Sequence, residues 1–193
     1  MQNMIKFDQN IFSWFNSFVG QNEVFDQIIK FFAVYLIYLV PILFIFFWFW
    51  KRNQKTQKFL LELFLTSVVS WQVIARIIGM VVNRPRPSTF AGAREIIFHP
   101  PTYAFPSDHA LFLAFLTTYL YLSGYKKIGN LALAATIIIS MSRIIVGFHW
   151  PADILAGWIL GIILAYAFYL IKDKLEKYII NPLWDLLKKI KLT

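Results

Sequence analysis

Three clusters of polar residues interrupt an otherwise apolar chain, and their residue types suit phosphate chemistry. They combine guanidinium groups, two imidazoles, hydroxyls and carboxylates at Arg84, Arg86, Ser107, Asp108, His109, Ser142, Arg143, His149 and Asp153. A guanidinium can bind two oxygens of a phosphate group through parallel hydrogen bonds. The clusters contain no group of acidic residues suited to a hard cation, so we expect neither a metal ion nor another cofactor.

The spacing of His149 and Asp153 favours nucleophilic catalysis. The two residues are four apart, and Pro151 stands at a position typical of the start of a helix. One helical turn would therefore bring the carboxylate to the imidazole. A carboxylate bonded to one ring N–H leaves the other ring nitrogen free to attack phosphorus.

Other residues of the clusters are suited to binding the phosphoryl group and assisting its transfer. Arg86 and Arg143 can neutralise its oxygens in a five-coordinate transition state. A helix that starts after Ser107 adds unpaired backbone N–H groups. His109 can protonate the leaving oxygen.

The elements that must position these residues are membrane helices. The chain is 59% hydrophobic with a mean hydropathy of +0.59, whereas soluble proteins are roughly 45–50% apolar. Five stretches approach the length that crosses a membrane, although the third is short: 31–50, 59–82, 108–124, 128–147 and 152–172. The pair Gly157 and Gly161 favours helix packing inside the bundle over dimerisation. We expect one all-α integral membrane domain over residues 1–193.

Two flanking segments have the pattern of helices that lie on a membrane surface. Near the N-terminus, apolar side chains fall mainly on one helical face, at Ile11, Phe12, Trp14, Phe15 and Phe18. After the last span, apolar residues alternate with Lys at helical spacing, with an interruption at 181–182. A solvated tail explains this second pattern equally well.

The placement of Lys and Arg predicts which ends of the spans share a side. Basic residues follow the first and third spans and fill the C-terminal tail, with Lys51, Arg52, Lys55, Lys58, Lys126 and Lys127 in the two connectors. Short basic loops stay cytoplasmic, and contact with anionic lipid explains the net charge of +9 better than nucleic-acid binding does. By parity, we expect the N-terminus, the long connector 83–107 and the turn 148–151 to lie together on the opposite side, outside the cytoplasm.

The polar clusters resemble the three motifs of the type 2 phosphatidic acid phosphatase (PAP2) superfamily, which also includes vanadium haloperoxidases. The third motif reads Ser-Arg, five residues, His, three residues, Asp, and matches in full at 142–153. Pro-Ser-Gly-His matches at 106–109 except for its Gly, and the first motif keeps its Arg-Pro at 86–87. The resemblance covers residues 76–153 directly.

This resemblance implies a membrane-embedded phosphatase and a role for each matching residue. It implies His149 as nucleophile, Asp153 as its orienting partner and His109 as general acid. The phosphate ligands that it implies are Arg86, Ser107 and Arg143. The neighbouring residues Arg84 and Asp108 are further candidates for substrate binding, and Ser142 takes a supporting role.

Two departures from the family pattern narrow the expected function. The Lys of the first motif falls at Gly79, and the Gly of the second has become Asp108. Loss of the Lys argues against a haloperoxidase, which needs a dense anion pocket. Together with the segment Arg-Pro-Arg-Pro, these departures resemble the bacitracin-resistance type of undecaprenyl pyrophosphate phosphatase. That subgroup hydrolyses the C55 lipid pyrophosphate to the monophosphate.

Both departures require compensation by nearby charges. Asp108 beside an anionic substrate needs a basic partner, either Arg84 or another base. Arg76, three residues before Gly79, is either a partial substitute for the missing Lys or a residue that pairs within the bundle.

Several alternatives share these motifs, because the motifs recognise a phosphoryl group rather than its tail. Phosphatidic acid, phosphatidylglycerophosphate or a lipid A phosphate could replace the isoprenoid substrate. A non-catalytic lipid-phosphate binder or transporter is a different class, but the intact pair of His149 and Asp153 weighs against it. The expected partners are the lipid substrate and membrane lipids; the sequence does not specify an oligomeric state.

Overall fold

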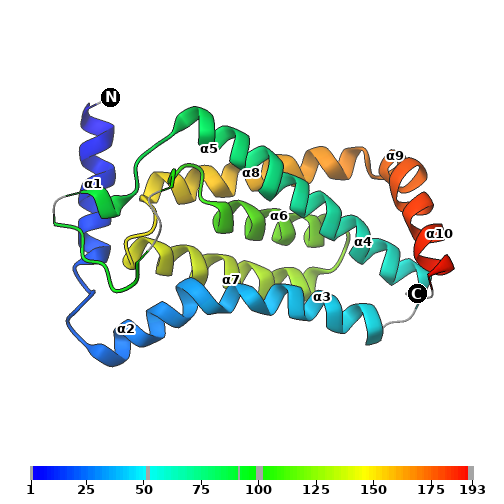
Figure 1. Cartoon of the computed structure of the whole chain (residues 1–193), viewed down its shortest axis with the longest axis horizontal. Helices are drawn as coiled ribbons and strands as arrows, with labels where there is room; N and C mark the ends of the chain where they lie inside the picture. The colour runs from blue at the N-terminus through cyan, green and yellow to red at the C-terminus, as the bar shows by residue number, and fades with distance from the viewer. Residues whose placement is uncertain (1, 51–52, 91, 99–101, 191–193) are drawn as a thin grey trace.

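The computed structural model describes residues 2–50, 53–90, 92–98 and 102–190, with the side chains of 2–5 excepted, and every regular element in these ranges is helical (Figure 1). This confirms the predicted all-α fold. The elements in chain order are α1 (Gln2–Asn16), α2 (Glu23–Lys30), η1 (Phe31–Tyr35), η2 (Leu36–Tyr38), α3 (Leu39–Trp50), α4 (Gln54–Val68), η3 (Val69–Ala75), α5 (Arg76–Val82), η4 (Pro87–Thr89), α6 (Asp108–Leu122), α7 (Lys126–Ile145), α8 (Pro151–Leu170), α9 (Lys172–Leu175), η5 (Glu176–Ile180) and α10 (Asn181–Lys189).

The helices run back and forth along the long axis of the molecule (Figure 1). The first pass comprises α2 to α3 and the second α4 to α5, followed by α6, α7 and α8. Within the described residues, four helices are long and apolar enough to cross a membrane, namely those that begin at Glu23, Gln54, Lys126 and Pro151. The predicted third span is α6, whose 15 residues extend about 22 Å, less than the roughly 30 Å of a hydrocarbon core. The third pass is therefore a short central helix.

Side-chain caps explain why the first two passes begin earlier than the apolar runs predict. The side chain of Asn22 accepts a hydrogen bond from the backbone N–H three residues later, so α2 starts at Glu23 and not near residue 31. Asn53 caps α4 in the same way, so this helix starts at Gln54 and not near residue 59. Both passes consequently begin with a capped segment that precedes the apolar run.

The central helix α6 is packed on several sides. It contacts α7, α8 and η3, and most of its side chains are buried, which is why its sequence shows no single apolar stripe. A Cβ added at Gly161 would lie 3.0 Å from the Cβ of Ala114 and closer still to a backbone carbonyl of α6. At Gly157 it would lie 2.8 Å from the carbonyl oxygen of Ser107. These contacts confirm that the two glycines serve packing inside the bundle.

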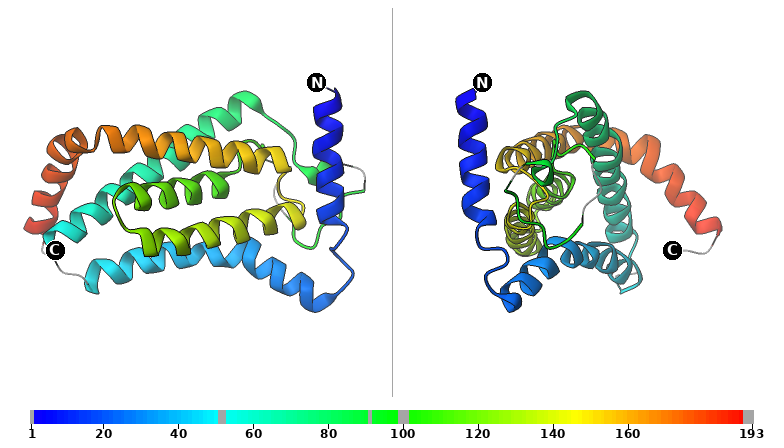
Figure 2. Two further views of the ribbon diagram at one scale, coloured as in Figure 1. Left: turned by 180° about the vertical axis from the view of Figure 1, so that it is seen from behind. Right: turned by 60° about the vertical axis from the view of Figure 1, so that its left-hand side comes forward.

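The terminal segments cross the two ends of the bundle (Figure 2). In α1, Phe12 is buried against Trp150, with ring centroids 5.0 Å apart. At the other end, α9, η5 and α10 form one helical run that buries Trp184. The predicted interruption at 181–182 is wrong, because the proline falls in the first turn of α10, where a helix tolerates it.

The connectors separate a basic end of the bundle from the end that carries the motifs. The end of α3 and the start of α4, the α6–α7 turn and the α8–α9 junction lie at one end, as the distribution of Lys predicts (Figure 1). Lys51 and Arg52 lie outside the described residues. The long connector between α5 and α6 and the turn between α7 and α8 lie at the other end.

Gly161→Leu is expected to destabilise the bundle, because the added side chain would force α8 away from α6. Overpacking of this kind costs about 1–3 kcal/mol, so the thermal unfolding midpoint of the detergent-solubilised protein should fall. Ala167→Leu, on an exposed face of the same helix, is the matched control and should leave the midpoint unchanged. Equal midpoints for the two variants would contradict a close α6–α8 contact.

Candidate active site

The long connector and the α7–α8 turn bring the predicted site residues to one end of the bundle (Figure 2). They come from the segment after α5, the start of α6, the end of α7 and the start of α8. In that order they are Arg84 and Arg86; Ser107, Asp108 and His109; Arg143; and His149 and Asp153.

The imidazole of His149 is buried and held in one orientation. Its Nδ1–H donates a hydrogen bond of 2.9 Å to the carbonyl of Ala104. The carbonyl can only accept, so Nδ1 carries the proton and Nε2 presents a lone pair. Nε2 lies 3.4 Å from Nη1 of Arg86. The unprotonated ring nitrogen therefore faces a guanidinium group, from which it can accept a hydrogen bond at this distance.

Asp153 does not hold the imidazole by a direct hydrogen bond, contrary to the expectation from the spacing. Its Oδ2 lies 3.9 Å from Nδ1 of His149 and accepts a hydrogen bond of 2.9 Å from the backbone N–H of Trp150. Its Oδ1 accepts a hydrogen bond of 2.7 Å from Arg84. The carboxylate thus fixes the start of α8, and Ala104 supplies the acceptor for the ring.

The surroundings of His149 favour a neutral imidazole. Burial lowers the pKa of His149 well below its ordinary value, and the positive charges of Arg143 and Arg86 lower it further. A neutral ring retains the lone pair on Nε2, and a protonated ring would lose it. The same guanidinium groups that could attract an anion therefore keep the histidine nucleophilic.

Two buried arginines are held in place by uncharged groups. Nη1 of Arg86 donates a hydrogen bond of 2.7 Å to the carbonyl of Phe148, and its Nη2 donates one of 3.0 Å to the hydroxyl of Thr102. Arg143 donates a hydrogen bond of 2.9 Å to the carbonyl of Ala33, and its guanidinium carbon lies 5.0 Å from the ring centroid of Phe148. These hydrogen-bond acceptors are uncharged, so they do not neutralise the guanidinium groups. Both arginines can therefore still bind an anion.

The start of α6 adds a buried hydroxyl and the second imidazole. Ser107 is fully buried, and its Oγ has no hydrogen-bond partner among the described residues. Its backbone N–H donates to the carbonyl of Asp153, at 3.1 Å, which joins α6 to α8. His109 lines an adjoining cavity. A buried hydroxyl with no partner among the described residues is suited to donating to a phosphate oxygen.

Of the two alternatives expected for Asp108, the structure favours another base over Arg84. Asp108 accepts a hydrogen bond from Trp71 and lies within electrostatic range of Arg143 and Arg86. Arg84 instead binds Asp153 and also forms an ion pair with Asp8 on α1. Since two carboxylates already occupy its guanidinium group, Arg84 is better placed to position Asp153 than to contact phosphate. Its role as a phosphate ligand stays a prediction.

An apolar cavity of about 470 Å³ adjoins this polar cluster. It lies between the first pass, α4 and α6, and side chains such as Ile37, Phe44 and Phe64 form its walls. Asp108, His109 and Arg143 also line it. The cavity therefore combines an apolar lining with ionisable groups, as a lipid with a charged headgroup requires.

Residues 59–177 match the family model of the PAP2 superfamily. The chain belongs to this superfamily. The matched region contains all three polar clusters, so the resemblance of their sequences to the PAP2 motifs is confirmed.

Curated relatives and a solved structure agree with this assignment. Undecaprenyl-diphosphatase of Sulfolobus acidocaldarius is 36% identical over 102 residues, which are 50% of this chain and 49% of that protein. Undecaprenyl-diphosphatase BcrC of Bacillus subtilis is 28% identical over 170 residues, 88% of this chain and 86% of that protein. The PAP2 type phosphatidylglycerolphosphate phosphatase of Bacillus subtilis has a TM-score of 0.67 at 18% identity, covering 92% of this chain and 90% of that one. This last likeness shows the fold.

The missing Lys of the first PAP2 motif has a structural explanation. A Cβ added at Gly79 would collide with the ring of Tyr103, which lies directly against the glycine. A lysine side chain therefore has no room at this position. Arg76, the candidate substitute, is exposed on α5, and its charge acts on Asp108.

Residues outside the PAP2 motifs also shape the site. Ala104 binds His149, and Thr102 binds Arg86. Asp8 binds Arg84. A small apolar residue, a threonine in a connector and an acid in an amphipathic helix have no distinctive spacing, so sequence reasoning missed all three. Ser142 matches the motif, but its hydroxyl donates to the α7 backbone at Ile138, at 2.8 Å.

The imidazole of His149 is expected to stay neutral at pH values well below the ordinary histidine pKa of about 6.5. Burial and the adjacent guanidinium groups destabilise its protonated form, so the pKa falls. Arg86→Gln removes one of these charges and should move the pKa back upward. The measurement is an NMR pH titration of the ¹⁵N-histidine-labelled protein, with Arg94→Gln as the control that leaves the value unchanged. Titration of His149 near 6.5 in the unsubstituted protein would overturn this prediction.

Proposed function

We propose that this PAP2 protein hydrolyses undecaprenyl diphosphate, or another polyprenyl diphosphate, to the lipid monophosphate and inorganic phosphate. The observation that carries the proposal is the orientation of His149. Its Nδ1 is bonded to Ala104, and its Nε2 lies 3.4 Å from Arg86. An imidazole held in this way presents a nucleophile where a guanidinium group can hold a phosphoryl group.

The proposed reaction passes through a phosphohistidine. The terminal phosphoryl group binds Arg86, Arg143 and the hydroxyl of Ser107. Nε2 of His149 bonds to phosphorus while the bond from phosphorus to the bridging oxygen breaks, and His109 gives a proton to that oxygen. The lipid monophosphate leaves. Water then attacks the phosphohistidine and gives a proton to His109, and the N–P bond breaks to release inorganic phosphate.

Asp153 supports this reaction through charge. The imidazole becomes positively charged when Nε2 bonds to phosphorus, and a carboxylate oxygen 3.9 Å from Nδ1 stabilises that charge. Its hydrogen bonds to Trp150 and Arg84 keep the carboxylate in place. Asp153 is therefore expected to affect the intermediate more than the initial orientation of the ring.

Three features support a polyprenyl diphosphate as the substrate. The apolar cavity beside His109 and Arg143 suits a hydrocarbon tail. The site lacks the motif Lys at Gly79, and a phosphate leaving group is less basic than an alkoxide, so it needs less assistance. The relatives in Sulfolobus acidocaldarius and Bacillus subtilis carry the name undecaprenyl-diphosphatase.

The proposal places the site on the extracytoplasmic side of a bacterial cytoplasmic membrane. Lys-containing connectors gather at the opposite end of the bundle, and short basic connectors stay cytoplasmic. The polar end with His149 then faces outward. A lipid diphosphate would reach it from the outer leaflet.

A glycerolipid phosphatase is the second candidate function. The fold resembles that of a phosphatidylglycerolphosphate phosphatase, and the polar cluster recognises a phosphoryl group whatever its tail. A glycerolipid monophosphate requires expulsion of an alkoxide, which places a greater demand on proton donation by His109.

Purified protein is expected to release phosphate from undecaprenyl diphosphate in the presence of a chelator. His149→Ala should lower this rate about a thousandfold or more, because the proposed nucleophile is lost. Phosphate release is compared for undecaprenyl diphosphate, phosphatidic acid and phosphatidylglycerophosphate. Ser142→Ala is the control, and its rate should stay within about twofold, because its hydroxyl bonds only to the helix backbone.

The outcomes separate the substrate from the mechanism. Activity on glycerolipids alone would overturn the assignment of a polyprenyl diphosphate. Full activity of His149→Ala on any substrate would overturn the histidine mechanism.

A further inference from the structure

Asp8 on α1 connects the N-terminal helix to the candidate active site. It is 7% exposed, and its Oδ2 forms an ion pair with Nη2 of Arg84. Its Oδ1 accepts a hydrogen bond of 2.9 Å from the backbone N–H of Ala152, in the first turn of α8. One carboxylate thus holds both the arginine and the helix that carries Asp153.

The contacts of Arg84 form a chain of alternating charges. Its Nη2 binds Asp8, its Nη1 donates to Asp153 at 2.7 Å, and its guanidinium carbon lies 5.4 Å from the ring centroid of Trp150. Asp153 alone cannot fix a guanidinium group that is partly exposed, because a single contact leaves it free to rotate. A second carboxylate on the other nitrogen fixes its plane and so the position of the Asp153 oxygen.

The helix α1 is anchored at this end of the bundle by further contacts. The side chain of Asn16 donates to the carbonyls of Arg94 and Ile145, at 2.9 and 2.8 Å, and Phe12 packs on Trp150. These residues precede the segment 59–177 that matches the PAP2 family model. The segment that positions Asp8 therefore lies outside the matched region.

We infer that Asp8 is a positioning residue for the reaction, acting through Arg84 on Asp153 and the start of α8. The inference rests on the proposed phosphatase function. Loss of its charge loosens Arg84, weakens the hold on the Asp153 carboxylate, and so reduces stabilisation of the phosphohistidine. Since Asp8 does not touch the phosphoryl group, substrate binding changes little.

The test compares Asp8→Asn with the unsubstituted protein on whichever lipid phosphate the latter hydrolyses. The expected result is a fall in kcat of about tenfold, the effect of one charge-assisted hydrogen bond, with KM and the unfolding midpoint nearly unchanged. Arg84→Gln should lower kcat similarly, and the double variant should be no slower than Arg84→Gln alone. Glu23→Gln, an exposed acid on the next helix, is the matched control.

Each result decides one point. An unchanged kcat for Asp8→Asn, or effects of the two substitutions that multiply, would overturn the positioning role. A fall in kcat that merely follows a lower unfolding midpoint would also overturn it. An unsubstituted protein that hydrolyses no lipid phosphate would overturn the proposed function instead.

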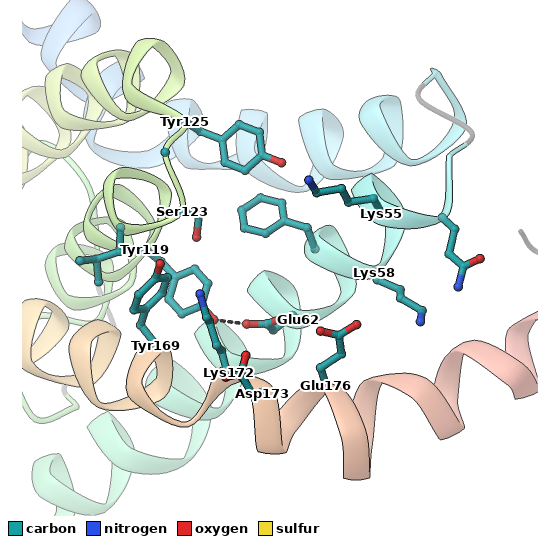
Figure 3. A pocket seen from close by; sticks show the side chains of 14 residues that line it. Lys55, Lys58, Glu62, Tyr119, Ser123, Tyr125, Tyr169, Lys172, Asp173 and Glu176 are labelled. Carbon is teal, nitrogen blue, oxygen red and sulfur yellow. Dashed lines mark hydrogen bonds between the residues drawn. The ribbon is translucent and has the colours of Figure 1, made fainter.

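A second cavity, of about 790 Å³, lies at the opposite, basic end of the bundle (Figure 3). Its lining combines three lysines with three acids, Lys55, Lys58, Lys172, Glu62, Asp173 and Glu176. A ligand with only negative charge would meet the three acids, and one with only positive charge would meet the three lysines. A ligand that carries both charges matches this balance.

The acidic part of this cavity is built around Glu62 on α4. Its carboxylate accepts a hydrogen bond from the hydroxyl of Tyr119, and the ring of Tyr169 lies nearby (Figure 3). An acid in a membrane-spanning helix is costly unless it has a partner or a function. The ammonium of Lys172 already lies 4.2 Å from the ring centroid of Tyr169, which shows that this aromatic surface accepts an ammonium group.

The geometry points to a binding site for a phosphoethanolamine group, with its ammonium beside Glu62 and its phosphate beside the lysines. A phospholipid headgroup is the source that the position favours, since the lining residues lie at the start of α4 and at the ends of α6 and α8. The test uses native mass spectrometry of the delipidated protein with phosphatidylethanolamine or phosphatidylglycerol of equal chain length. The expected result is about fivefold greater retention of phosphatidylethanolamine.

Glu62→Gln keeps an acceptor for Tyr119 and should abolish this preference. Asp185→Asn, an exposed acid on α10, is the control and should keep it. Competition by free phosphoethanolamine would support recognition of the headgroup alone, and its absence would support recognition of the membrane lipid. Equal retention of both lipids, or an unchanged preference in Glu62→Gln, would overturn the site.

Discussion

The two backbone hydrogen bonds of Ala104 align the segments that form the candidate active site. Its N–H donates to the carbonyl of Arg84 at 2.7 Å, and its carbonyl accepts from His149 at 2.9 Å. Ala104 is fully buried, so loss of either bond would leave a polar group unpaired at a cost of about 1–3 kcal/mol. The connector therefore cannot move away from the α7–α8 turn without releasing the imidazole. The bond from Arg86 to the backbone of that turn depends on the same alignment.

The arginines of the site divide according to the charge of their partners. Arg86 and Arg143 donate to carbonyl and hydroxyl oxygens, which hold a guanidinium group without neutralising it. Arg84 binds two carboxylates and is electrostatically satisfied. A buried guanidinium group with only uncharged partners, as in Arg86 and Arg143, is costly in the absence of an anion. This cost favours binding of a phosphate group. The ion pairs of Arg84 instead stabilise the backbone and side chains around Asp153.

Local composition was sufficient to predict much of this molecule. Apolar runs predict the passes, basic connectors predict which ends share a side, and motif spacing predicts which polar residues meet. The remaining features depend on contacts between distant segments. Nothing in the sequence indicates that Tyr103 fills the space beside Gly79, or that Ala104 rather than Asp153 bonds to His149. The helix α6 ends at Leu122, two residues before the predicted end, and Gly124 just beyond it has a positive φ of 84° that a helix cannot continue through.

The packing of the connector on α5 links the missing lysine to the proposed substrate. The ring of Tyr103 lies against Gly79, and its neighbour Ala104 accepts the hydrogen bond that orients His149. A lysine at Gly79 would have to displace that ring, which is adjacent in the chain to the acceptor of the imidazole. The site therefore gains a fixed nucleophile and loses one cation. A reaction that expels a phosphate tolerates this exchange better than one that expels an alkoxide, because less charge develops on the leaving oxygen and His109 needs to supply less assistance.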